Sequence, residues 1–276
     1  MRELPPPNYE YEISKLVNAY KQAMLDIQRE LQRIDLNDFQ RATANATLKS
    51  IADILAQLDE TTSVWIQTNV PVAVNDGIVR SIIALELVNT VAEAENIVKF
   101  SRLNNELVKA VVADTQDDLL QVTQNVSRKV RTTIRQVTAE VLRAKTTKGI
   151  NGTSALTSEL VANLRKQLGS AVETGIIDAS RRRWKPEVYA EMVVRTKMLQ
   201  AHKEATINDG ISRGANYGVI SRHGATDACR NWEGKIVKLT PAAEGDYPYI
   251  GDLPNREIFH PNCKHVVSPV KRPDRV

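Results

Sequence analysis

Apolar residues recur at intervals of three and four along most of the chain, a spacing that lines one face of an α-helix. Between residues 9 and 34 the apolar positions are Ile13, Leu16, Val17, Tyr20, Met24, Ile27, Leu31 and Ile34. Between residues 117 and 145 they are Leu119, Val122, Val126, Val130, Ile134, Val137 and Val141. The pattern therefore predicts two long amphipathic helices in these stretches.

Further helices are predicted where the spacing is less regular. One follows the first helix and carries apolar residues up to Leu58, and we expect Pro71 and the turn-forming triplet at residues 75–77 to interrupt the stretch after it. Residues 78–100 return to helix-forming composition, and a shorter helix is expected over residues 154–168. Pro186 stands where proline is tolerated in a first helical turn, so residues 187–212 are expected to form another helix.

The pattern changes after residue 214. Residues 218–222 and 235–239 look like short strands, a loop rich in proline and glycine covers residues 241–254, and Val266 and Val267 are expected to add a last strand. We therefore predict a mainly α fold with three parts. These are a disordered N-terminal arm over residues 1–8, an elongated helical body over residues 9–214, and a small α+β module with a short tail over residues 215–276.

Composition narrows the class of protein. Only 5% of the 276 residues are aromatic, which favours cores of aliphatic side chains where helices meet. The net charge of +4 and the pI near 9.0 are compatible with contact to nucleic acid but do not require it. Two cysteines form no disulfide framework, so we expect synthesis in a reducing compartment. No apolar run approaches the ~20 residues of a membrane span.

Metal-ligand residue types are concentrated near the C-terminus, because five of the six cysteines and histidines lie between residues 223 and 265. Zinc in structural sites takes four nitrogen or sulfur ligands, and a metal can replace hydrophobic core in a small module. The candidate ligands of a structural zinc ion are Cys229, His260, Cys263 and His265, with His223 as a substitute if His260 points away. The alternative is that the histidines bond loop carbonyls and the cysteines are small buried residues.

Two further constellations point to nucleic acid. The same histidines with Asn262 could hold a metal for phosphodiester cleavage, but the nearby carboxylates Asp227, Glu233 and Glu257 show no recognisable arrangement. We therefore expect no enzyme and keep a metal-dependent nuclease as the alternative. The densest basic cluster supplies the candidate DNA-binding residues Arg181, Arg182, Arg183 and Lys185, and we assign Trp184 within it a structural role.

The order of motifs in the last third resembles a known family. Trp184, Glu187, Tyr189, Met192 and Arg195-Thr196 come first, then His223-Gly224 with Cys229, Trp232 and Gly234-Lys235, then the run over residues 260–265. Over residues 181–269 this combination is similar to the minor head proteins of tailed bacteriophages, in the minor capsid protein 2 and Mu F-like head morphogenesis group. That family often has cysteine at the position of His265, and some members have a second cysteine near Trp232.

The resemblance implies a structural virion component, made in the host cytoplasm and placed inside the head at the portal vertex. It implies a role in head morphogenesis, genome packaging or DNA ejection. The implied partners are the portal protein, other head or scaffolding proteins and packaged double-stranded DNA, with no membrane and no small-molecule substrate. A helical DNA-binding protein without portal contacts is a third hypothesis.

Overall fold

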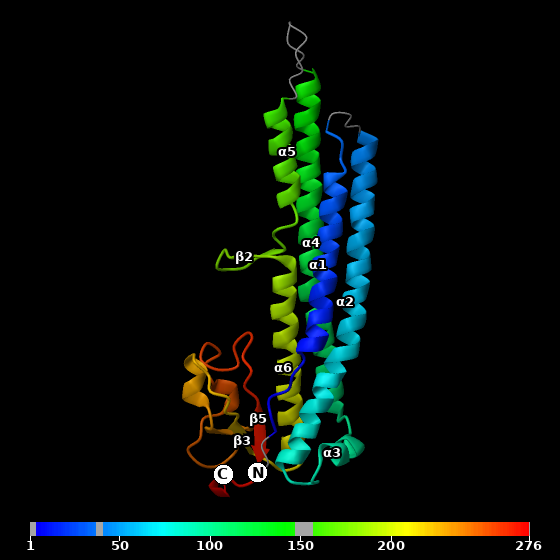
Figure 1. The fold of residues 1–276 in the computed structure, drawn as a ribbon. Helices are drawn as coiled ribbons and strands as arrows, with labels where there is room; N and C mark the ends of the chain where they lie inside the picture. The colour runs from blue at the N-terminus through cyan, green and yellow to red at the C-terminus, as the bar shows by residue number, and fades with distance from the viewer. Residues whose placement is uncertain (1–3, 37–40, 147–156, 276) are drawn as a thin grey trace. The chain divides into compact units, whose positions relative to one another are not determined.

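The computed structural model describes residues 4–36, 41–146 and 157–275, and within them it holds six α-helices and two small antiparallel sheets (Figure 1). The helices are α1 Glu10–Gln32, α2 Arg41–Ala84, α3 Val91–Ile97, α4 Arg102–Thr146, α5 Ser158–Ser170 and α6 Pro186–Ser212. The strands are β1 Ile176–Ile177, β2 Arg183–Trp184, β3 Tyr217–Ile220, β4 Ile236–Lys238 and β5 Val267–Val270, and the 3-10 helices are η1 Ala228–Trp232, η2 Ile250–Asp252 and η3 Pro273–Arg275. The expected mainly α fold is confirmed.

The two most regular predictions are also confirmed. All eight apolar positions predicted for the first helix are buried, seven of them on α1 and Ile34 just after its end. All seven on α4 are buried too, and α4 begins earlier than the pattern indicated. Helix α6 begins at Pro186 as expected, and the chain leaves it through Gly214, whose φ of +81° suits glycine. No helix in the described part of the chain is long and apolar enough to cross a membrane.

The expected interruption near residues 71–77 is wrong, because α2 runs without a break through Pro71 and Gly77. Gly77 is required by packing: a Cβ atom there would lie 2.2 Å from the carbonyl oxygen of His202 on α6. The hydroxyl of Thr206 also donates to the carbonyl of Gly77 at 2.9 Å. Glycine thus permits a close approach of two helix backbones, and this tertiary contact overrides its low helix propensity.

By its internal contacts the chain forms two compact units. One unit comprises Ser14–Val64 and Gln116–Glu191. In it the buried faces of α1, α2 and α4 carry aliphatic side chains, and Tyr20 lies fully buried 3.5 Å from the hydroxyl of Thr62. Helix α5 adds Leu164 and Leu168, while Arg165 donates to the carbonyl of Gln32 at 2.7 Å. This unit therefore has an aliphatic core, as its composition indicated.

The other unit comprises Met1–Ile13, Trp65–Thr115 and Met192–Val276. Its sheet has the order β4-β3-β5 with antiparallel pairing, which confirms the three short strands expected near the C-terminus. Arg80 of α2 is buried and donates to the carbonyls of Leu4 and Pro5 and, at 3.5 Å, to the hydroxyl of Ser268 on β5. Residues 1–3 of the predicted disordered arm lie outside the described residues.

Candidate metal centre

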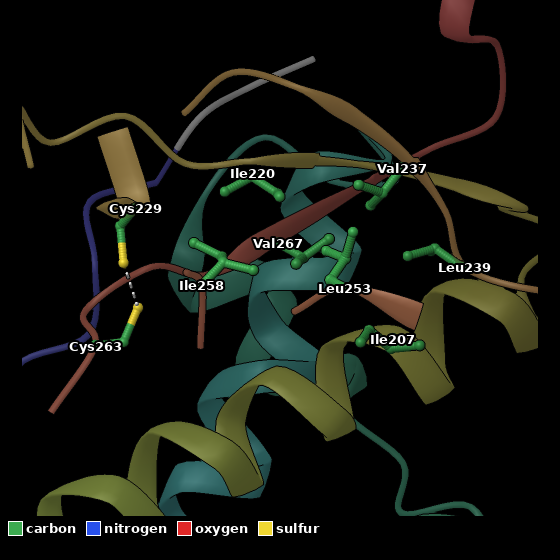
Figure 2. Packing of buried hydrophobic residues seen from close by; sticks show 9 residues of the cluster. All are labelled: Ile207, Ile220, Cys229, Val237, Leu239, Leu253, Ile258, Cys263 and Val267. Carbon is green, nitrogen blue, oxygen red and sulfur yellow. Dashed lines mark hydrogen bonds between the residues drawn. The ribbon is translucent and has the colours of Figure 1, made fainter. Parts of the chain in front are cut away.

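The cysteines of the C-terminal module lie at one end of its small hydrophobic core. Figure 2 shows the sulfur atoms of Cys229 and Cys263 facing each other there, while side chains from the strands, from α6 and from the segment between β4 and β5 fill the rest. The core consists of Ile207, Ile220, Cys229, Val237, Leu239, Leu253, Ile258, Cys263 and Val267. Both thiols are therefore held in position by the same packing that stabilises the module.

Local backbone structure fixes each cysteine. Asp227 caps η1, and its Oδ1 accepts a hydrogen bond from the amide of Cys229 at 3.0 Å. The amide of Cys263 donates to the carbonyl of His260 at 2.9 Å, which closes a tight turn. Phe259 and Asn262 flank this turn with φ values of +57° and +66°, a left-handed conformation that is uncommon for phenylalanine. Such strained positions cluster at functional sites.

Four side chains meet in this region. The Sγ of Cys229 lies 3.1 Å from Nε2 of His260 and 3.7 Å from Sγ of Cys263, which in turn lies 3.3 Å from Nδ1 of His265. Cys229, Cys263 and His265 are buried, whereas the side chain of His260 is 27% exposed. The four residues expected to bind a metal are thus brought together, although metal binding by them stays a prediction.

A second group adjoins the first through His265. Glu233 places Oε1 3.2 Å from Nε2 of His265, and the same oxygen accepts hydrogen bonds from the amides of His223 and Ala225 at 2.9 and 3.0 Å. Nε2 of His223 lies 3.3 Å from Nδ1 of His265, with the two rings 4.0 Å apart. The substitution of His223 for His260 is not required by this geometry, because His260 points toward Cys229.

The protonation states follow from these contacts. The amides of His223 and Ala225 lower the pKa of Glu233 to about 2. Burial, and then the charge of His223, lowers the pKa of His265, so its imidazole is neutral near pH 7. Burial and the neighbouring thiol of Cys263 raise the pKa of Cys229, so a bound metal would have to displace the thiol proton.

The carboxylates weighed for a hydrolytic site have other partners. Oδ2 of Asp227 lies 3.1 Å from Nε2 of His260, and Glu257 accepts a hydrogen bond from the indole of Trp232 at 3.1 Å. Burial alone would raise the pKa of Asp227, but hydrogen bonds from Cys229 and His260 outweigh it and lower the pKa. The central position of Glu233 was not predicted, because nothing in the sequence distinguishes it from the other acidic residues nearby.

Two cavities border this cluster. The smaller, of about 270 Å³, is lined by His223, Asp227, His260 and Lys264 among others. The larger, of about 650 Å³, lies against α6, where Lys203 contributes to its wall. The cluster can therefore be reached from the surface at His260.

The basic cluster at β2 lies in the other unit. All four candidate DNA-binding residues are exposed, but Arg182 donates to Asp178 at 2.6 Å and lies over the ring of Trp184. The indole of Trp184 donates to the same carboxylate at 3.0 Å and packs edge-on against Tyr189. The guanidinium of Arg182 is therefore already paired with a carboxylate. The contacts of Trp184 are those expected of a residue with a structural role.

The protein is thus mainly helical, and its C-terminal module contains a cluster of two thiols and two imidazoles in contact with one another. The model of the phage minor capsid protein 2 family matches residues 4–271, and the chain belongs to this family. The match covers nearly the whole chain, far more than the motifs of residues 181–269 indicated. No curated protein and no solved structure gives a significant match.

Proposed function

We propose that this protein is a structural minor head protein that binds the portal vertex inside the phage head. It would assist head morphogenesis, genome packaging or DNA ejection, without catalysing a reaction. The observation that carries the proposal is membership of the minor capsid protein 2 family over residues 4–271. The bonding of the module supports a structural role, because its thiols, imidazoles and carboxylates contact one another across segments distant in sequence.

Exposed apolar side chains support a protein partner. Five of them fall within one short segment that spans α3 and the start of α4, and large exposed apolar surface often marks protein contacts. They are Leu87, Val91, Ile97, Phe100 and Leu103. We assign this segment to the portal protein, with other head or scaffolding proteins as further partners.

Contact with packaged double-stranded DNA would use the exposed basic residues Arg181, Arg183 and Lys185, with Arg182 contributing less because Asp178 holds it. Each phosphate contact releases counterions, so binding should weaken steeply as salt rises. Replacing the three free residues with glutamine should lower the salt slope by up to about 3, roughly one unit for each lost contact. A slope that does not change would remove DNA from the proposed partners.

The portal proposal is tested by a pull-down with the portal protein of the same phage at moderate salt. The unaltered chain should be retained, and Phe100→Glu with Leu103→Glu should weaken retention. Val188→Glu is the matched control, because Val188 is a similarly exposed apolar residue on α6. Absence of association by the unaltered chain would refute portal binding, whereas equal loss in the control would refute the assigned surface.

The cavity lined by His223, His260 and Lys264 favours a metal-dependent nuclease as the second candidate. Histidines beside a cavity could hold a metal with an open coordination position, which hydrolysis requires. The purified protein is incubated with duplex DNA in magnesium, manganese or zinc. Cleavage that His260→Gln abolishes would replace the structural proposal with this one.

A further inference from the structure

Cys229, His260 and Cys263 each place a possible ligand atom within 4.8 Å of the others, and three distances in the cluster can be compared with a tetrahedral metal site. With Zn–S bonds near 2.3 Å and Zn–N bonds near 2.0–2.1 Å, a tetrahedron has edges of about 3.8 Å between sulfurs and about 3.6 Å between sulfur and nitrogen. The sulfurs of Cys229 and Cys263 are 3.7 Å apart, and the sulfur–nitrogen distances to His260 and His265 are 3.1 and 3.3 Å. Shifts of up to about half an ångström would bring these three edges to ideal length. His265 lies within 4.8 Å of His223 and Glu233 but not of all three other proposed ligands, so its imidazole must also move toward Cys229 and His260 to complete the tetrahedron.

We propose that Sγ of Cys229, Nε2 of His260, Sγ of Cys263 and Nδ1 of His265 bind one zinc ion as a structural site. Binding releases the two thiol protons to solvent, and because one divalent ion replaces two protons, the net charge of the four ligands with their bound protons or metal does not change. Four protein ligands leave no coordination position for a substrate, which is the arrangement of structural rather than catalytic zinc. This proposal is independent of portal binding, and either can fail without the other.

Hydrogen bonds on the far side of each imidazole select the same ligand atoms. Nδ1 of His260 lies 2.9 Å from the carbonyl oxygen of Pro261, which can only accept; in the tautomer that donates this hydrogen bond, Nε2 presents a lone pair. Nε2 of His265 lies 3.2 Å from the carboxylate of Glu233, so Nδ1 presents the lone pair toward Cys263. A metal-bound histidine is commonly oriented by such a carbonyl or carboxylate.

The contacts of His260 indicate that a cation belongs at this point. Its Nε2 lies 3.1 Å from both the thiol of Cys229 and the carboxylate oxygen of Asp227. If Nδ1 donates and the imidazole is neutral, Nε2 is an acceptor. It would then face the carboxylate oxygen of Asp227, which is also an acceptor. A proton on Nε2 or a metal ion beside it resolves this conflict, and the adjacent pair of sulfurs favours zinc over the proton.

Glu233 is the positioning residue of the site. Two backbone amides hold its carboxylate, and that carboxylate orients His265 without reaching the proposed ligand atoms of the cysteines. Loss of an outer partner of this kind typically lowers metal affinity by about 10–100-fold. His223 is assigned no ligand role, although its Nε2 lies 3.3 Å from Nδ1 of His265.

The site would join two segments of the module. Cys229 lies on η1, whereas His260, Cys263 and His265 lie on one stretch, residues 260–265, that leads into β5. The module has strands of only three and four residues, so a metal would supply much of the cross-linking that its small core lacks.

The test measures metal on the full chain, kept reduced and purified without chelator. We expect about one zinc per chain by mass spectrometry, and the visible absorption of tetrahedral thiolate-bound cobalt when Co²⁺ replaces zinc. Cys263→Ser and His265→Gln should each weaken binding by at least about 100-fold, and Glu233→Gln by about 10–100-fold. The control His223→Gln should bind as the unaltered chain does, and circular dichroism checks that each variant is folded.

Each result decides the proposal. If the unaltered chain stays free of zinc after dialysis against it, the zinc site is refuted and the cluster is a hydrogen-bonded network of thiols and imidazoles. If His223→Gln loses zinc while His265→Gln retains it, the assigned ligand set is wrong. If a ligand variant unfolds, the metal content and the cobalt spectrum of the unaltered chain still decide. Equal affinity of Glu233→Gln and the unaltered chain would leave zinc in place but refute the role of Glu233.

Discussion

His202 should make the stability of the protein fall as the pH drops below 6.5. The residue lies on α6 at 2% exposure, and burial together with the nearby charge of Arg80 lowers its pKa from 6.5 to about 3. In the unfolded chain the imidazole takes up a proton near pH 6.5, but in the folded protein it stays neutral until about pH 3. The unfolded state therefore binds more protons between these values, and stability is lost as the pH falls through them.

The size of the effect follows from the shift. Each pH unit within the window costs about 1.4 kcal/mol, so the free energy of unfolding should be lower by about 2 kcal/mol at pH 5 than at pH 7.5 from His202 alone. Other titratable groups of the protein also contribute to the pH dependence of its stability, so a difference between variants is required. His202→Leu removes the titrating group. Between pH 7.5 and 5 its free energy of unfolding should therefore fall by about 2 kcal/mol less than that of the unaltered chain.

The assay is urea unfolding followed by circular dichroism at pH 7.5, 6 and 5. Thr206→Val is the matched control, because it removes the hydroxyl that donates to the carbonyls of Gly77 and His202 and contains no titrating group. The loss in free energy of unfolding caused by Thr206→Val should be the same at every pH. If His202→Leu and the unaltered chain lose equal stability between pH 7.5 and 5, His202 is not held neutral and the argument is refuted.

Two further predictions concern helix packing and capping. Gly77→Ala should destabilise the protein by roughly 2 kcal/mol, because overpacking against the carbonyl of His202 outweighs the gain in helix propensity. Gly169→Ala, where the new Cβ meets open space, should instead stabilise by about 0.5 kcal/mol, and thermal unfolding of both variants checks the contrast. Thr90→Ala removes the capping box that Thr90 forms with Glu93 at the start of α3, at a cost of about 1 kcal/mol to that helix. Faster amide exchange confined to α3 would bear this out, whereas unchanged exchange would contradict it.

The long regular helices could be predicted because periodic burial needs no knowledge of neighbours. The aliphatic positions of α4, such as Val126 and Ile134, face the core at the spacing that the sequence displays. The continuity of α2 could not be predicted. The reason for Gly77 is its close contact with the backbone of His202 on α6, which lies more than a hundred residues further along the chain. Local propensity at Pro71 and Gly77 indicated a break, and tertiary packing prevailed.

For the candidate site too, the residue types could be predicted from the sequence, whereas the geometry could not. Residue types alone predicted Cys229, His260, Cys263 and His265 as one candidate metal site, with a hydrogen-bonded cluster of histidines and buried cysteines as the alternative. The orientation of the proposed ligand His265 depends on a partner that the sequence does not mark, the carboxylate of Glu233. A carboxylate becomes such a partner only when a fold brings backbone amides and an imidazole to it from different segments.

The loop that carries His260 and Cys263 is fastened to α6, and this gives the proposed zinc a role beyond its own module. Phe259 places its ring 4.3 Å from the ammonium group of Lys203, and the amide of Asn262 donates to the hydroxyl of Thr196 at 3.3 Å. Both of these loop residues have positive φ, so the two contacts with α6 hold the conformation that aims His260 at Cys229. Because a ligand loop attached to a helix transmits any displacement to it, loss of zinc should loosen the middle of α6, around Thr196 and Lys203, as well as the module.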